Sequence, residues 1–302
     1  MELMSSTFSL LCHPLLDTIE RETNEYFLAN WPFPDMKSRQ KFIGGGFSRC
    51  TCMYFPRARD DRIHFACRLL TILFLIDDVL EGMSFDEGRA YNGKLMAIVR
   101  REEAPDRSIP VQSMFHDLWE SMRANDEELT EGIVEPLFIF MRSQTDDRRA
   151  QPMSLMQYLE YRDKDIGQAL LCALMRFCLD IKLIPEELAL VHPADVNCGK
   201  HIAVINDIWS FEKEALTARN DQEGSVLCNS VAILSAEAGL STASSKRILH
   251  YMCLEWEEKH RKMLEELLDG HENAVLTNYF QGLEYQMSGN LAWSKLTHRY
   301  QM

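Results

Sequence analysis

Two groups of oxygen-bearing side chains have the spacing of metal ligands. The first, residues 77–81 (DDVLE), follows the apolar run Leu69–Ile76. On a helix Asp77 and Glu81 share a face, with Asp78 beside them. Acids at the end of a buried helix are costly unless cations meet them. Such carboxylates suit Mg²⁺, which typically takes one or two of them together with substrate phosphate.

The second group is Asn206, Ser210 and Glu214, at positions i, i+4 and i+8. On one helix these residues form a single stripe of oxygen donors. The apolar pair Val204-Ile205 precedes it, so the stripe begins inside the core. An ordinary polar helix face is the simpler interpretation of the stripe taken alone. Because two oxygen clusters occur on separate helices, we predict that they bind metal ions together.

Two further acidic pairs are expected to cap a helix and to lie at the surface, respectively. Asp60-Asp61 precedes a predicted helix, where an N-cap and a first-turn acid are favoured by the helix dipole. The other pair is Asp146-Asp147. We expect it to form a solvated charge cluster with three arginines: Arg142, Arg148 and Arg149.

The elements that position these groups are predicted to be helices, since strand signals are nearly absent. Residues 64–80 are apolar almost all round, which indicates a helix at the centre of a bundle. Gly44-Gly45-Gly46 lacks the Gly-Lys-Ser/Thr ending of a phosphate loop, so we interpret it as a helix-breaking turn. RNDQEGS (219–225) reads as a polar loop directly after the second group. The other predicted helices are 109–123, 127–142, 155–183, one starting at Pro185, 194–216, 241–268 (ended by Asp269-Gly270) and 276–293.

Composition narrows the classes of function. The 302 residues contain no linker-like segment, so we expect one domain over 1–302. The formal net charge of −14 argues against nucleic acid and anionic membranes as partners. The nine cysteines are interpreted as mostly buried free thiols in a reducing compartment. With no signal peptide and no apolar run long enough to span a bilayer, we expect a cytoplasmic protein without membrane insertion.

The two groups match motifs of the class I terpene cyclases. Residues 77–81 fit the family's D-D-x-x-E pattern, and NDIWSFEKE (206–214) fits its N-D-x-x-S-x-x-K-E pattern. The segments DDRIHFACRLLTILFLIDDVLE (60–81), YLEYRDKDIG (158–167) and GLEYQMSGN (282–290) resemble one branch, the fungal aristolochene synthases. The resemblance runs from about Leu11 to Tyr300. It implies an all-α class I terpenoid synthase bundle around a central apolar cavity.

The resemblance also implies an activity and its site residues. The enzyme would be a carbon–oxygen lyase, a sesquiterpene cyclase that converts farnesyl diphosphate through germacrene A to aristolochene and releases diphosphate. Three Mg²⁺ ions would be held by Asp77, Asn206, Ser210 and Glu214, with Asp78 and Glu81 in support. The diphosphate would be bound by Arg162, Lys213, Arg299 and Tyr300. Aromatic rings that stabilise the carbocation would be Tyr54, Phe74, Phe140 and Trp293. A homodimer or homotetramer is expected on the same ground.

The sequence departs from the resembled branch at a few positions. Trp209 and Phe211 stand where the family has tyrosines, and Cys50 and Cys52 are expected near the cavity wall beside Tyr54. These differences bear on the product, for which germacrene A, an eremophilene or a eudesmane are the alternatives.

Two other classes of protein fit the sequence less well. A chain-elongating prenyl diphosphate synthase would carry two D-D-x-x-D motifs, so the Asn/Ser/Glu group disfavours it. A non-catalytic helical scaffold or lipid-binding bundle would show no metal dependence and would tolerate Asp77→Ala.

Overall fold

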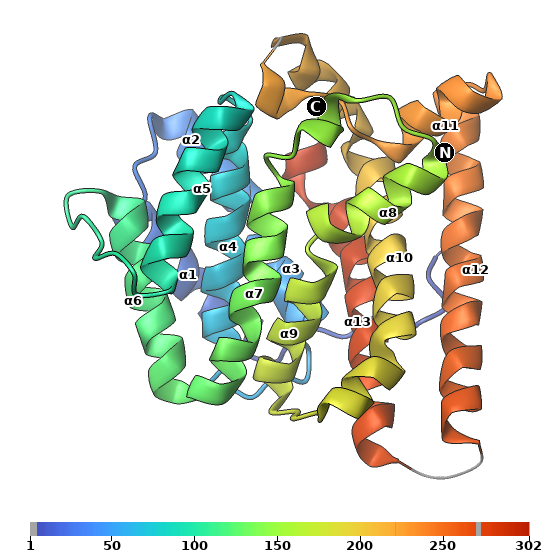
Figure 1. Cartoon of the computed structure of the whole chain (residues 1–302), viewed down its shortest axis with the longest axis horizontal. Helices are drawn as coiled ribbons and strands as arrows, with labels where there is room; N and C mark the ends of the chain where they lie inside the picture. Colours follow the sequence, from blue (N-terminus) through green and yellow to red (C-terminus); the bar gives the residue numbers. More distant parts are fainter. Residues whose placement is uncertain (1–4, 221, 270–272, 302) are drawn as a thin grey trace.

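The computed structural model describes residues 5–220, 222–269 and 273–301. Helices joined by short connections make up most of this part, which contains no strand. The long helices run up and down beside one another (Figure 1), so the predicted all-α bundle is confirmed. The helices are α1 (Leu16–Asn30), α2 (Met36–Gly45), α3 (Phe47–Tyr54), α4 (Ile63–Leu80), α5 (Phe85–Val99), α6 (Pro110–Asn125), α7 (Glu127–Ser143), α8 (Leu155–Asp165), α9 (Gln168–Leu179), α10 (Pro185–Thr217), α11 (Ser230–Ala238), α12 (Thr242–Leu268) and α13 (Ala274–Leu296). Short 3₁₀ turns are η1 (Asp147–Ala150), η2 (Ala218–Asn220), η3 (Glu223–Ser225) and η4 (His298–Tyr300).

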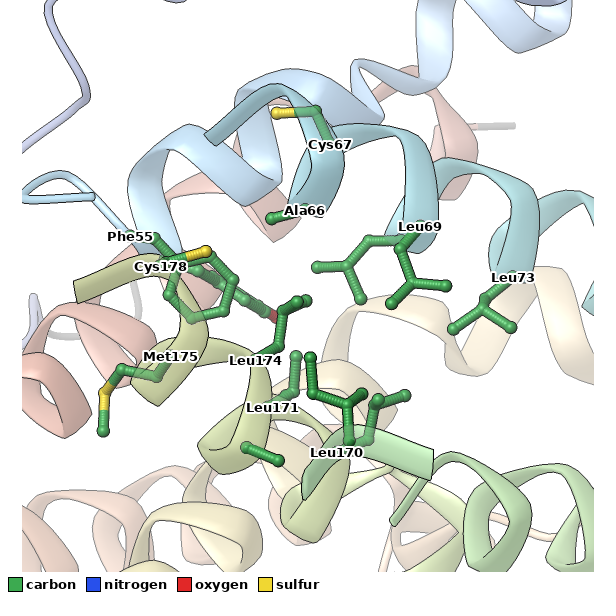
Figure 2. Close-up of a cluster of buried hydrophobic side chains, with 14 of the residues drawn as sticks. Phe55, Ala66, Cys67, Leu69, Leu73, Leu170, Leu171, Leu174, Met175 and Cys178 are labelled. Carbon is green, nitrogen blue, oxygen red and sulfur yellow. The ribbon is translucent and has the colours of Figure 1, made fainter. Parts of the chain in front are cut away.

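Helix α4 is the inner helix that the sequence predicted. Its side chains are buried on every face, and it packs against α1, α3, α6 and α9. Figure 2 shows Leu69 and Leu73 of α4 pointing toward Leu170, Leu171 and Leu174 of α9. Burying a Leu side chain contributes about 1.5–3 kcal/mol. This apolar packing fixes the end of α4 that carries residues 77–81.

The long helix predicted over 155–183 is wrong, because the chain breaks between α8 and α9. Gly167 adopts a left-handed conformation with φ of 74°. A Cβ there would lie 3.1 Å from Cδ2 of Phe140, so glycine suits both the backbone and the packing. The break turns residues 165–167 toward the interior.

Helix α10 carries the second group and joins two segments that the sequence treated separately. Pro185 occupies its first turn, and Pro193 lies inside the helix without ending it. Helix α10 packs against α12 and α13, and its last turn reaches the same end of the bundle as the end of α4 and the chain's C-terminal residues, uppermost in Figure 1.

Other turns follow local signals. Gly46 ends α2 in the left-handed conformation, with φ of 58°, so the predicted helix break falls at Gly46, while Gly44 and Gly45 still belong to α2. Asp60 and Asp61 do not cap α4, because Arg62 is the N-cap residue and Asp61 pairs with Arg59 instead. Helix α12 (Thr242–Leu268) fits the predicted range of 241–268 to within one residue, with Ser241 as its N-cap and Asp269 as its C-cap. Gly270 lies outside the described residues.

The cysteines are mostly buried free thiols, as the sequence predicted. All nine cysteines are free, and eight of them are buried. No helix in the described part of the chain combines the length and the hydropathy that a membrane crossing requires.

Candidate active site

The carboxylates at the end of α4 form one compact group. Asp77, Asp78 and Glu81 each place an oxygen within 4.8 Å of the others. Burial raises the pKa of Asp77; Arg299 opposes this shift, and the carboxylates of Glu81 and Asp78 add to it. The group therefore favours a nearby cation, in line with the prediction from the spacing of residues 77–81.

Two cationic side chains of the protein already contact this carboxylate group. Arg299 lies 2.8 Å from Asp78 Oδ1 through Nη1 and 3.2 Å from Asp77 Oδ2 through Nη2. Lys213 Nζ donates to Glu81 Oε1 at 2.6 Å. Arg299 comes from η4 and Lys213 from α10, so the acidic end of α4 is tied to both.

The stripe on α10 and the acidic group at the end of α4 face one cavity. Asn206, Ser210 and Glu214 line it together with Asp77 and Glu81. Asn206 Oδ1 accepts from Arg162 Nη2 at 3.0 Å, and its Nδ2 donates to the Tyr300 hydroxyl at 2.7 Å. Ser210 Oγ is buried and has no hydrogen-bond partner among the described residues. An unpaired hydroxyl between an amide and a carboxylate is suited to a hard cation, so these residues fit a magnesium site.

The four predicted diphosphate contacts meet at the same end of the cavity. Arg162, Lys213, Arg299 and Tyr300 all line it. Arg162 also makes the i,i+3 pair with Asp165 that a surface interpretation would give, but both side chains are almost fully buried. Although burial alone would lower it, Tyr158, Asp165 and Asp207 hold the pKa of Arg162 well above its usual range.

The remaining wall is apolar and aromatic. The four predicted rings, Tyr54, Phe74, Phe140 and Trp293, line it with leucines from α4 and α9. The Phe74 and Trp293 ring centroids are 5.5 Å apart. Trp293 Nε1 donates to the Gly45 carbonyl at 2.9 Å, and the Tyr54 hydroxyl donates to Asn290 Oδ1 at 2.8 Å. Each polar tip is thus held by the protein, and the apolar parts of these rings contribute to the cavity wall.

Arg149 is a lining residue that sequence reasoning missed. The neighbouring acids lie at the surface as predicted, with Asp146 bound by Arg148. Arg149 instead turns inward, where its Nη1 donates to Asp165 Oδ1 at 2.8 Å. Nothing in the sequence distinguishes Arg149 from Arg148, because the direction of each side chain is set by how η1 packs on the bundle.

A second missed element closes the cavity between α4 and α10. We call residues 222–228 the strap. Gly224 N donates to Met83 O at 3.0 Å, and Glu223 Oε2 accepts from Phe85 N at 2.8 Å. Gly224, Ser225 and Val226 line the cavity. For its described residues, which exclude Asp221, the polar composition of 219–225 predicted a loop correctly, but it gave no sign that the loop binds the α4–α5 connection and the first residue of α5.

Four residues that mark departures from the resembled branch lie outside the lining. Trp209 and Phe211 pack with Tyr158 and Trp256 in a second apolar cluster formed by α8, α10, α11 and α12. Cys50 and Cys52 are buried in α3, and Cys52 Sγ lies 3.9 Å from Cys67 Sγ. Any effect of Trp209, Phe211 and Cys52 on the product must therefore pass through packing, whereas Cys50 lies beside the Tyr54 hydroxyl, as expected.

Comparison with known proteins places the chain in a family. Residues 68–259, more than half of the chain, match the family described as "Terpene synthase family 2, C-terminal metal binding". An aristolochene synthase of Aspergillus terreus is 56% identical over 98% of this chain and 93% of its own length. A (+)-aristolochene synthase of Penicillium expansum is 52% identical over 99% of this chain and 91% of its own.

The fold agrees with this assignment. The crystal structure of aristolochene synthase from Penicillium roqueforti superposes with a TM-score of 0.87 and 46% sequence identity, covering 98% of this chain and all of that one. Hedycaryol synthase, at 18% identity and a TM-score of 0.76, shares the fold. The chain belongs to terpene synthase family 2, in the branch of the fungal aristolochene synthases.

Proposed function

We propose that this chain is a magnesium-dependent sesquiterpene cyclase that converts farnesyl diphosphate to aristolochene through germacrene A. The observation that carries the proposal is the joint placement of two oxygen clusters, from α4 and α10, at one end of an apolar cavity, with three cationic side chains between them. An anionic head and a hydrocarbon tail match these two environments.

The metal sites follow from the same geometry. We infer three Mg²⁺ ions, with Asp77 as the main ligand at the α4 group and Asn206, Ser210 and Glu214 as the ligands at the stripe. When bound, the ions supply Lewis-acid charge that makes diphosphate a better leaving group. Arg162, Lys213, Arg299 and Tyr300 are proposed to donate hydrogen bonds to the diphosphate oxygens. Arg162, Lys213 and Arg299 now donate to Asn206, Glu81, Asp77 and Asp78, so diphosphate binding requires these three cations to exchange partners. The Tyr300 hydroxyl accepts from Asn206 Nδ2.

The cavity wall then governs the fate of the carbocation. Phe74, Phe140, Tyr54 and Trp293 present aromatic faces, which stabilise a cation through their quadrupoles. The docked strap excludes water, which would otherwise quench the cation. Because the Tyr54 hydroxyl donates to Asn290, its proton is directed away from the ligand. We therefore propose the released diphosphate as the group that accepts and returns the proton.

Finer properties are part of the proposal. We infer a single domain, a cytoplasmic location and a homodimer or homotetramer. The free, mostly buried thiols support a reducing compartment.

The test is incubation with farnesyl diphosphate and Mg²⁺, followed by gas chromatography–mass spectrometry of the extract. Aristolochene as the main hydrocarbon supports the proposal, and the absence of any hydrocarbon overturns the cyclase function. Germacrene A, an eremophilene or a eudesmane as the main product overturns the product assignment alone. Geranyl and geranylgeranyl diphosphate run in parallel test the chain length.

Site variants provide the second arm. Asp77→Ala and Asn206→Ala should lose turnover while circular dichroism and melting temperature stay close to wild type. Asp60→Ala is the matched control, because Asp60 is an exposed acid outside the cavity. Wild-type turnover in Asp77→Ala and Asn206→Ala would contradict the assignment of the metal sites.

A further inference from the structure

Asn229 is a fully buried asparagine that follows the strap and belongs to neither acidic motif. It has no exposed surface and is the N-cap residue of α11. Its backbone begins a helix that packs against α8, α10 and α12. The side chain therefore sits at the junction between α11 and the helix that carries the stripe.

The Asn229 amide is fully used, and one of its contacts is a candidate metal ligand. Oδ1 accepts from Val231 N at 2.8 Å, which is an N-cap bond. Nδ2 donates to Asp207 O at 3.1 Å and to Glu214 Oε2 at 2.9 Å. The amide oxygen thus caps α11, and the amide nitrogen donates hydrogen bonds to two residues of α10.

The position of Asn229 is fixed from a second direction. Asp207 Oδ2 accepts from Ser230 N at 2.9 Å and from the Tyr158 hydroxyl at 2.6 Å. The first turn of α11 is therefore held against α10 whether or not Asn229 contacts Glu214. The Asn229 amide reaches Glu214 from an anchored backbone.

The consequence concerns the Glu214 carboxylate. Glu214 lies in the last turn of α10, only partly buried, where a glutamate has three rotatable side-chain bonds. Asn229 holds Oε2, and no described residue donates a hydrogen bond to Oε1. A carboxylate fixed through one oxygen presents the other in a defined direction, as partners of metal ligands commonly do.

We propose that Asn229 is a positioning residue for the metal ligand Glu214, aligning its carboxylate with Ser210 and Asn206 through the Nδ2 hydrogen bond. This rests on the proposed function, in which Glu214 binds Mg²⁺. A role limited to capping α11 would need only Oδ1, so substitutions that separate the two halves of the amide distinguish the two roles.

The variants are chosen to keep the cap. In Asn229→Ser the hydroxyl can still accept at the N-cap, while the donor to Glu214 is lost. Asn229→Asp keeps both the shape and the cap but places a carboxylate against Glu214. Asn273→Ser is the matched control, because Asn273 caps α13 through Val275 N and Leu276 N and does not line the cavity.

The readout is the binding of Mn²⁺ in the presence of saturating inorganic diphosphate. Binding is measured as the decrease in the electron paramagnetic resonance signal of the free ion. We expect Asn229→Ser to weaken Mn²⁺ binding by about 10- to 100-fold and Asn229→Asp to weaken it further. Asn273→Ser should bind as wild type. Adding Asn229→Ser to Glu214→Gln should cause no further loss.

The outcomes separate this inference from the proposed function. If Glu214→Gln binds Mn²⁺ as wild type does, Glu214 is not a ligand and the site assignment fails. If Glu214→Gln is weakened but Asn229→Ser and Asn229→Asp bind normally, the positioning role is overturned. Melting curves accompany each variant, and an equal loss of Mn²⁺ binding in Asn273→Ser would also overturn it.

Discussion

Replacing Gly224 by alanine should undock the strap without unfolding the bundle. A Cβ on Gly224 would lie 2.0 Å from the Leu80 carbonyl oxygen and 2.9 Å from that of Met83. Carbon–oxygen contacts of this kind begin at about 3.3 Å, so the strap must retreat by more than about 1 Å. Both obstacles are backbone, one at the last residue of α4 and one in the connection from α4 to α5, and neither can move at low cost.

The magnitude follows from the bonds that the retreat breaks. These are Gly224 N to Met83 O at 3.0 Å and Phe85 N to Glu223 Oε2 at 2.8 Å. A neutral bond contributes about 1 kcal/mol, and a bond to a charged group about 1.5–3 kcal/mol. Because Glu223 is exposed, we discount its share and expect a total of about 2 kcal/mol. That corresponds to about a 30-fold change in the ratio of docked to undocked strap.

Two assays measure this effect. Hydrogen exchange at the Gly224 amide should accelerate by about 30-fold, while amides in α4 and α10 keep their protection. Product analysis with farnesyl diphosphate should show lower turnover and new farnesyl-derived alcohols, because water reaches the carbocation.

The matched control is Gly93→Ala. A Cβ at Gly93, inside α5, would meet nothing within 4 Å, so this variant should keep wild-type turnover and gain up to about 1 kcal/mol of stability. If Gly224→Ala retained both wild-type exchange and the wild-type product, the docking of the strap would have no part in water exclusion.

Two further predictions concern buried charges. Arg149→Met should remove one of the two cationic partners of Asp165, leaving Arg162, and cost about 1.5–3 kcal/mol in the free energy of unfolding, with weaker binding of inorganic diphosphate. The neighbouring Arg148→Met, at a half-exposed position, should change stability by less than about 1 kcal/mol. Equal effects in these two variants would contradict the buried role of Arg149. Glu257 accepts hydrogen bonds from Thr7 and His201, which bring its pKa down to about 2 against the raising effect of burial. Since this pKa is below its usual value, the ionised Glu257 contributes to the free energy of unfolding in full above about pH 4.5. As the pH falls toward 2 this stabilisation, about 3 kcal/mol, is lost. Denaturant titrations at about pH 5 and pH 3 should show a smaller loss in Glu257→Gln than in wild type, and equal losses would refute the linkage.

Helices with continuous amphipathic or apolar patterns could be predicted from the sequence. Helices α4, α7 and α12 match the predicted ranges to within a residue or two, because their periodic pattern is unbroken. Helix α5 was missed, since Gly88, Asn92 and Gly93 weaken its helical signal. Its Ser84–Glu87 capping box was a usable sign of a helix start. The break at Gly167 could not be inferred, because it depends on Phe140 from a distant helix.

The site divides in the same way. Ligands spaced on one helix, such as Asn206, Ser210 and Glu214, are predictable because the helix itself sets their relative positions. Arg149, Asn229 and Gly224 lie in connections whose course is set by packing against other helices. The roles of these three residues depend on contacts with residues more than ten positions away along the chain, such as that of Asn229 with Glu214. A single sequence carries no pattern for such contacts.

The pairing of charges at the cavity end has a consequence for ligand binding. Arg299 forms ion pairs with Asp77 and Asp78, and Lys213 forms one with Glu81. Arg162 donates a hydrogen bond to Asn206. A metal ion binding alone must displace these donors, and diphosphate binding alone must leave carboxylates without their cations. When both bind, each takes the groups that the other releases, so their binding free energies should be coupled.

Coupling of this kind is reciprocal and can be measured from either side. We expect inorganic diphosphate to tighten Mn²⁺ binding by about 5- to 150-fold, and Mn²⁺ to tighten diphosphate binding by the same factor. Arg299→Gln should reduce both factors equally, because it removes the cation shared between Asp77 and the diphosphate. Calorimetric titrations of each ligand, with and without the other, give the two factors. Independent binding of the two ligands would show that the pairs seen here do not compete with them, and the proposed exchange of partners would have to be abandoned.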